Sequence, residues 1–178
     1  MKQLFTIFGL ACLVLITMFY VSCVNKLSPQ DTQIIEAMQP VAKGEGVAQA
    51  ASYTHDGVTN PVVLICTSGK IHDWTDDIPT EWKPTSLGET ELVICVGEEK
   101  EKSIQVCQYT GPSVTRYQHY VDVELREAKT GILVASTILY GSMPSYCKGS
   151  EDYYVTRLDG SDVSFDQLKS WLETYVIQ

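Results

Sequence analysis

The stretch Tyr117–Tyr140, YQHYVDVELREAKTGILVASTILY, decides the fold class of this chain. From Tyr117 to Leu125, largely apolar side chains at odd positions alternate with largely polar ones at even positions. This period of two residues predicts a β-strand with one buried face. Ala128–Gly131 (AKTG) suits a type I turn with glycine last, which is typical of a bulged hairpin. Ile132–Tyr140 is apolar at several positions on both faces, so we expect it to be a central strand covered on both sides.

Four shorter apolar runs upstream add strands to this hairpin, because their β-branched residues favour extended backbone. They are Val62–Thr67, Ile71–Trp74, Glu91–Gly97 and Ser103–Tyr109. The last two flank Glu98–Lys102 (EEKEK), and five charged residues between two apolar runs predict a solvated hairpin turn.

The C-terminal segment has the pattern of an amphipathic helix. Ser164 and Gln167 form a capping box at its start. One wide apolar stripe follows, made of Phe165, Leu168, Trp171, Leu172 and Tyr175. The predicted fold class is α+β: an antiparallel β-meander of five or six strands with a C-terminal helix packed on one face, preceded by an N-terminal hydrophobic membrane segment.

Three segments are expected along the chain. Residues 1–23 form a signal, a lipoprotein signal or a transmembrane anchor. Residues 24–60 form a short helix and a linker, because Ser28 before Pro29 is typical of a helix start and the following Gly- and Ala-rich stretch lacks periodicity. Residues 61–178 form one extracytoplasmic α+β domain, since 178 residues leave room for a single domain.

The leading apolar segment determines the expected location. The 18 residues Leu4–Val21 carry no charge, and as a helix they cover roughly 27 Å, close to a hydrocarbon core of about 30 Å. Three interpretations stay open: an uncleaved anchor, a cleaved secretory signal, and a lipoprotein signal with Cys23 as the lipidated residue. The third has one departure, because Tyr20 occupies a position that is usually aliphatic in such signals. In all three, the rest of the chain is expected to be membrane-anchored or exported at the extracytoplasmic face of the cell envelope.

Charge excludes one class of partner. The chain has 22 acidic and 13 basic residues, a formal net charge of -9, and its basic residues are scattered. Nucleic-acid binding depends on grouped Lys and Arg that neutralise phosphates, so no nucleic-acid partner is expected.

The downstream cysteines predict disulfides. Cys66, Cys95, Cys107 and Cys147 form an even set in a short domain, which favours a disulfide framework with three possible connectivities in an oxidising compartment. If a hairpin is centred on Glu101, Cys95 faces Cys107, and Cys66 is left for Cys147. No two of these cysteines stand two to four residues apart, so a structural zinc site is not expected.

The segment His72–Trp82, HDWTDDIPTEW, is the candidate ligand-binding site. It places carboxylates beside indole rings, a combination that serves carbohydrate binding or glycoside chemistry. The candidate residues are Trp74, Trp82, Asp73, Asp76 and Asp77. Two other interpretations are a calcium-binding loop, which lacks the EF-hand spacing, and a polar surface loop whose tryptophans fill the core. His119, on the apolar face of its strand, is interpreted as a core histidine rather than a ligand.

The leading functional hypothesis is a membrane-tethered extracytoplasmic binding or interaction module without catalytic activity. Its partner is expected to be a protein or a carbohydrate, and no cofactor or metal is predicted. The alternative is a secreted or envelope hydrolase that uses carboxylates of the Asp73–Glu81 loop or a Cys66 nucleophile. A purely structural envelope component is the third possibility.

Overall fold

The computed structural model describes residues 27–54, 59–68, 71–149 and 155–177. The apolar segment Leu4–Val21 and the proposed lipidation site Cys23 lie outside these residues. In the described part, no helix is both long and apolar enough to cross a bilayer.

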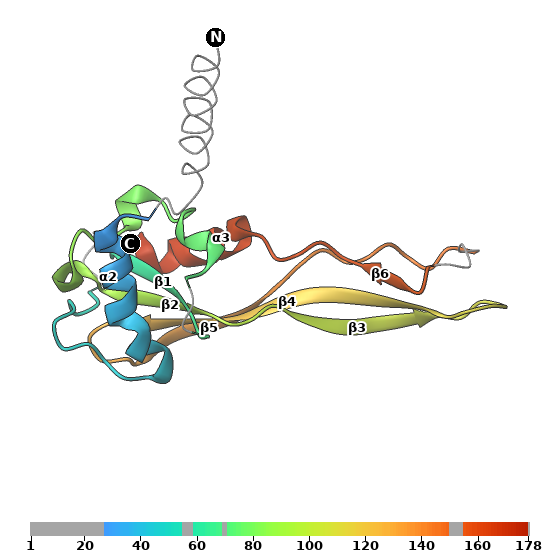
Figure 1. Ribbon diagram of the computed structural model, residues 1–178, viewed down its shortest axis with the longest axis horizontal. Coiled ribbons are helices and arrows are strands. Elements are labelled where there is room, and N and C mark those ends of the chain that lie inside the picture. The colour runs from blue at the N-terminus through green and yellow to red at the C-terminus, as the bar shows by residue number, and fades with distance from the viewer. Residues whose placement is uncertain (1–26, 55–58, 69–70, 150–154, 178) are drawn as a thin grey trace, which may run out of the picture.

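One long strand, β4 (Val114–Glu127), is the centre of a six-stranded mixed sheet (Figure 1). On one edge of β4, β2 (Leu92–Val96) pairs with its C-terminal half and β3 (Lys100–Cys107) with its N-terminal half, both antiparallel. On the other edge, β5 (Leu133–Tyr140) is antiparallel to β4 and β6 (Arg157–Asp159) is parallel to it. The outer strand β1 (Val62–Cys66) runs parallel to β2.

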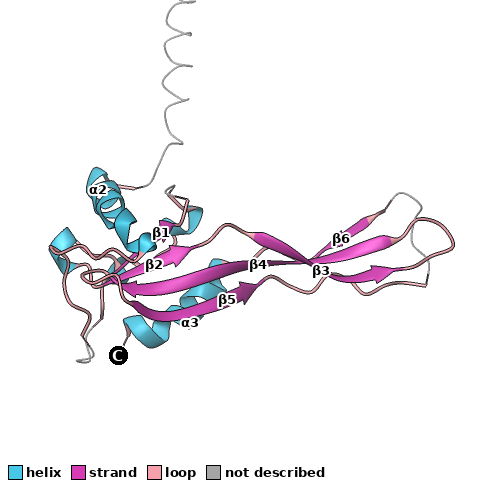
Figure 2. Ribbon diagram, turned by 90° about the horizontal axis from the view of Figure 1, so that it is seen from below, coloured by secondary structure: helices cyan, strands magenta, loops and turns pink. Residues whose placement is uncertain are grey.

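The two halves of β4 belong to two differently built parts of the molecule (Figure 2). We call the first part the body: β1, β2, β5, residues 120–127 of β4, and the helices. We call the second part the arm: β3, β6 and residues 114–119 of β4. The arm projects from the body, and in the described chain neither of its faces is covered by a helix.

Helix α2 (Pro29–Met38) covers one face of β1 and β2. It begins where the Ser28 hydroxyl accepts a hydrogen bond from the Asp31 backbone N–H, and proline occupies its first turn. Its buried side chains pack against the odd-numbered residues of β1 and β2. This hydrophobic cluster under α2 includes Ile34, Ile35, Met38, Val63, Ile65, Val93 and Cys95.

Helix α3 (Phe165–Val176) covers the opposite face and confirms the predicted C-terminal helix with its capping box. Leu168, Leu172 and Val176 are fully buried against β1, β2 and β4. Burying a leucine side chain stabilises a fold by about 1.5–3 kcal/mol. Because helices cover β1 and β2 on both faces, all five residues of each strand are buried.

The hairpin of β4 and β5 confirms the interpretation of the Tyr117–Tyr140 stretch. The Gly131 N–H donates to the Glu127 carbonyl at 2.8 Å, and Gly131 has a φ of 73°. A side chain there is strained, and a Cβ atom would also lie 2.4 Å from the Gly44 carbonyl oxygen.

The expected meander is wrong in three respects. First, the sheet is mixed, because β1 is parallel to β2 and β6 is parallel to β4. Second, Glu98–Lys102 is no hairpin turn: β2 continues into β3 in the same direction, since both run antiparallel to β4. Third, β5 is not a central strand: among the described strands it pairs with β4 alone, and most of its residues are exposed or half-buried.

The described part of the connection from β1 to β2 holds three short 3₁₀ helices, η2 (Asp73–Thr75), η3 (Thr80–Trp82) and η4 (Leu87–Glu89). The predicted strand Ile71–Trp74 is therefore wrong. Trp82 is only 2% exposed and fills the core under α3, as the interpretation of a polar loop with core-filling tryptophans expects for this residue.

The predicted disulfide pairing is also wrong. Cys107 is bonded to Cys147, with 5.7 Å between their Cα atoms, whereas Cys66 and Cys95 are free and buried. Without the expected hairpin, Cys95 lies opposite Glu124 and Cys107 opposite Val114. These two positions on β4 are ten residues apart, roughly 34 Å along an extended strand.

Nor can the two free thiols reach each other. Cys66 lies opposite Val96 and Cys95 opposite Ile65 in the parallel pair of β1 and β2. Val96 belongs to the cluster under α3 and Ile65 to the cluster under α2. The thiols therefore point to opposite faces of the sheet, where no disulfide geometry is possible.

Candidate metal centre at the junction of body and arm

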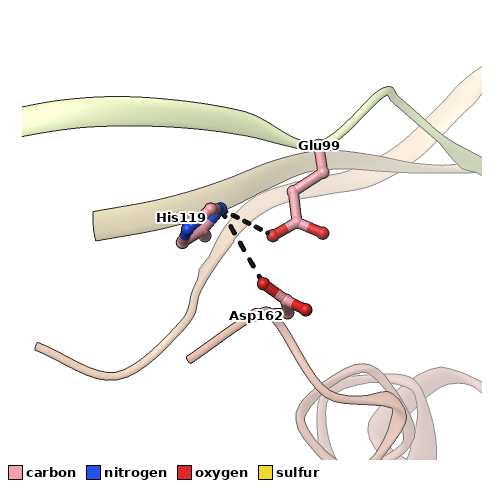
Figure 3. Close-up of side chains that lie close together, drawn as sticks. All are labelled: Glu99, His119 and Asp162. Carbon is pink, nitrogen blue, oxygen red and sulfur yellow. Dashed lines mark ion pairs between the residues drawn. The ribbon is translucent and has the colours of Figure 1, made fainter. Parts of the chain in front are cut away.

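His119 lies on β4 where the body meets the arm. One residue further, Tyr120 pairs with the last residue of β5 and with the first residue of β3. Two carboxylates from distant parts of the chain converge on the imidazole (Figure 3). Glu99 comes from the connection between β2 and β3, and Asp162 from the connection between β6 and α3.

The distances bring three potential ligand atoms together. His119 Nδ1 is 3.1 Å from Glu99 Oε1 and 3.9 Å from Asp162 Oδ1, and all three atoms lie within 4.8 Å of one another. In a tetrahedral zinc site with bonds of about 2.0–2.1 Å, neighbouring ligand atoms are roughly 3.3 Å apart. The present spacing thus suits a small divalent cation after minor side-chain adjustment.

Two glycines allow the backbone segments around the centre to approach closely. A Cβ atom at Gly141 would lie 1.9 Å from the Ser161 carbonyl oxygen, and one at Gly160 would lie 1.8 Å from the Ser142 carbonyl oxygen. Reciprocal hydrogen bonds join the same segments: the Ser142 N–H donates to Ser161 Oγ, and the Ser161 N–H donates to Ser142 Oγ. This contact holds the connection that carries Asp162.

A further carboxylate lies on the other side of the imidazole ring. Asp159 Oδ1, at the end of β6, is 3.6 Å from His119 Nε2. The Arg157 side chain donates to both oxygens of Asp159 at 2.8 Å and also pairs with Glu101. Its hydrogen bonds hold the pKa of Asp159 below the usual value, so this carboxyl stays ionised beside Nε2.

This arrangement has the form of a histidine metal ligand with an outer carboxylate. Such histidines ligate through one ring nitrogen and direct the other N–H to a carboxylate, which fixes the tautomer and strengthens the ligand. Here Nδ1 faces Glu99 and Asp162, while Nε2 faces Asp159.

The ligand atoms are open to solvent on one side. The side chain of His119 is 19% exposed, whereas that of Asp162 is 79% exposed. A surface hollow of about 430 Å³ is lined by Glu99, Lys100, Glu101, His119 and Asp162. A bound ion would therefore keep coordination positions for water or for a ligand.

A second hollow, of about 300 Å³, adjoins the centre through Glu99 and Asp162. It is lined by two of the sequence-predicted site residues, Asp73 and Trp74, and by His72. The His72 Nδ1 atom accepts a hydrogen bond from the Trp74 backbone N–H. Burial lowers the pKa of His72, and the nearby Asp73 charge opposes this shift only in part.

The structure does not bring the other predicted site residues to this place. Trp82 is buried in the core. Asp77 lines a different hollow with Phe165 and Lys169, and Asp76 is exposed. Only Asp73 and Trp74 of the five candidate residues therefore lie beside the candidate metal centre.

Comparisons with known families, curated proteins and solved structures find no match. The chemistry of this centre therefore has to be inferred from its own donor atoms.

Sequence reasoning missed the centre for a definite reason. Its three residues are spread from position 99 to position 162, and no ligand spacing relates them. Of the three, only His119 stands out in the sequence, and the odd-position pattern of its strand predicts a core residue. The ring is in fact only half-buried, because β4 leaves the covered body at this position.

Proposed function

We propose that this chain is a membrane-tethered extracytoplasmic binding module that takes up one Zn²⁺ ion through Glu99, His119 and Asp162. The observation that carries the proposal is the convergence of these three side chains, with Asp159 behind the imidazole. One imidazole and two carboxylates suit Zn²⁺ better than Ca²⁺, which prefers six to eight oxygen ligands.

The proposed location is supported by two features. The segment Leu4–Val21 has the length and composition of a membrane segment or export signal. The disulfide between Cys107 and Cys147 agrees with an oxidising compartment. The mass of the intact membrane-extracted protein tests both, since it reports cleavage before Cys23, attached lipid and the number of disulfides.

The hydrolase alternative receives less support. Of its carboxylates, Asp73 lies beside the metal centre, whereas Asp77 faces another hollow. The thiol of Cys66 lies 2.9 Å from the Ser68 hydroxyl and forms its hydrogen bond there rather than with an imidazole. A binding role therefore fits the described groups better than hydrolysis.

Zinc titration of the chelator-treated, full-length protein in detergent tests the metal proposal. We expect one Zn²⁺ per chain by calorimetry, and weaker binding by roughly tenfold or more for Glu99→Gln and for Asp162→Asn. Glu98→Gln and Asp166→Asn remove neighbouring exposed carboxylates and serve as matched controls that should bind like the unmodified chain. The proposal is wrong if zinc does not bind, or if all four variants bind it equally.

A further inference from the structure

We infer that β5 is the contact strand of a homodimer, in which a second copy of this chain adds its own β5 in antiparallel orientation. One side of β5 is paired with β4, and no other described strand pairs with it. Figure 2 shows β5 along the margin of the body. Its outer backbone N–H and C=O groups thus form an edge that another strand can extend.

The composition of β5 is unusual for a solvent-exposed edge. Natural edge strands carry charged residues, prolines or bulges that prevent pairing. The run Ile132–Tyr140 has no charged residue and no proline. Its one irregularity lies at Val134, and at the other end the Tyr140 carbonyl accepts a hydrogen bond from Gln167 Nε2 of α3, so Ala135–Leu139 forms a regular pairing edge of five residues.

Exposed apolar side chains also gather on this strand and at the residue before it. They are Ile132, Leu133, Ile138 and Tyr140, each between 42% and 64% exposed. Helix α3 covers the face of the body to which Leu139 points. Ile138 and Tyr140 alternate with Leu139 and therefore point to the other face of the sheet. On that same face, α2 covers side chains of β1 and β2. A second copy would continue this face and bury part of these side chains.

The charges beside β5 favour a second copy over a partner of opposite charge. On the same face of β4, Asp122 is paired with Lys100 at 2.6 Å, and Glu124 is paired with Arg126 at 2.7 Å. These two carboxylates, which lie on β4 directly beside β5, are therefore already paired within the chain and do not attract a basic partner.

Electrostatic repulsion between the two negatively charged copies is also small in this arrangement. Between two copies paired through β5, the nearest charged strands are the two β4 strands, three strand spacings or roughly 14 Å apart. This distance exceeds the Debye length of about 8 Å at physiological ionic strength, so the net charge of -9 does not prevent the contact.

Symmetry restricts the register. Residues opposite each other in an antiparallel pair point to the same face, and faces alternate along a strand. When a strand pairs with its own copy, the two-fold axis therefore passes between one residue and the same residue of the copy. It cannot relate two neighbouring residues of the strand, because these point to opposite faces. For the five-residue edge, the axis lies at Thr137, so Ile138 lies opposite Ser136 of the second copy and diagonally across the axis from its own copy.

Sedimentation of the full-length chain in detergent, at several protein concentrations, tests this inference. We expect a dimer, and for Ile138→Lys a dissociation constant at least about tenfold higher, because two like charges would lie on the same face as diagonal neighbours across the axis. Ile177→Lys makes the same change at an exposed residue after α3 and should leave the dimer intact. Mixing Ile138→Lys with Ile138→Glu chains should restore a mixed dimer.

A Thr137→Cys variant supplies an independent readout. Under mild oxidation it should form a crosslinked dimer, whereas Glu173→Cys on exposed α3 should not. A monomeric unmodified chain, an open-ended series of oligomers, or a dimer insensitive to Ile138→Lys would each overturn the inference. Zinc binding is measured at a different site, so failure of this inference leaves the proposed function untouched.

Discussion

Arg157 organises the groups behind His119. Its guanidinium donates to Asp159, pairs with Glu101, and lies over the Tyr117 ring at 4.2 Å from the ring centre. Hydrogen bonds from Arg157 lower the pKa of both carboxyls, so both stay ionised near neutral pH. Asp159, which faces the Nε2 atom of His119, is thus itself held by Arg157. Arg157 in turn contacts β3 through Glu101 and β4 through the Tyr117 ring.

His72 should make stability depend on pH. Its pKa is lowered by burial, so between its ordinary value of about 6.5 and the lower folded value the unfolded chain binds more protons. The free energy of unfolding therefore falls as the pH drops through this window. His72→Asn keeps an acceptor for the Trp74 N–H but does not titrate. Denaturant unfolding at pH 8, 7, 6 and 5 should show a smaller loss for this variant, and equal losses would contradict the assignment.

The free thiols should be inert in the folded chain. Burial raises the pKa of the Cys95 thiol to about 12, which leaves almost no thiolate at neutral pH. Cys66 is likewise buried. Peptide mapping after alkylation should show both residues modified only when the protein is first unfolded, with Cys107 linked to Cys147. A link between Cys95 and Cys107, or fast labelling of Cys95 in the native protein, would contradict the described pairing.

Local sequence patterns predicted where helices and strands form better than they predicted which strands pair with each other. The capping box at Ser164 and the apolar stripe that follows it are local, and α3 forms where they predict it. The turn at Ala128–Gly131 is equally local, and the hairpin is confirmed. Glu98–Lys102 misled because charged residues suit an exposed edge strand as well as a turn, and β3 is such a strand.

Gly160 should affect the metal centre without being a ligand. A Cβ atom there would lie 1.8 Å from the Ser142 carbonyl oxygen, so Gly160→Ala must shift the segment that carries Asp159 and Asp162. We expect weaker zinc binding by roughly tenfold, as for loss of an outer contact. Gly149→Ala is the control, because its Cβ atom would meet nothing within 4 Å. Unchanged affinity in Gly160→Ala would show that the close contact does not position the centre.

At the scale of the whole molecule, β4 joins a covered body to an arm without helices. The candidate ligands lie at this junction, and they come from β4 and from the two connections that cross it. The disulfide between Cys107 and Cys147 ties the far end of β3 to the segment after β5. Closing a loop of this size lowers the entropy of the unfolded chain and so raises the free energy of unfolding by roughly 3–4 kcal/mol. The arm is therefore stabilised by a covalent link where it lacks a core.

Zinc should stabilise the protein as a whole, because the unfolded chain does not hold the three ligands together. At a free concentration of about 100 times Kd, the gain is about 2.7 kcal/mol, which corresponds to a rise of roughly 5–10 °C in Tm for a chain of this size. Thermal unfolding with Zn²⁺ and with chelator measures it. Glu99→Gln should show little rise and Glu98→Gln the full rise. An equal rise in both variants would place the ion elsewhere.

Local sequence patterns are enough to specify the α+β class, the β4–β5 hairpin and the C-terminal helix, because each follows from neighbours within one element. They also specify the long apolar segment at the N-terminus. The folded chain is needed to see that β2 and β3 share one edge of β4, that Cys107 bonds to Cys147, and that Glu99 and Asp162 meet His119. These are contacts between residues far apart in the chain, and the period of a strand specifies which face a side chain takes but not which strand lies beside it.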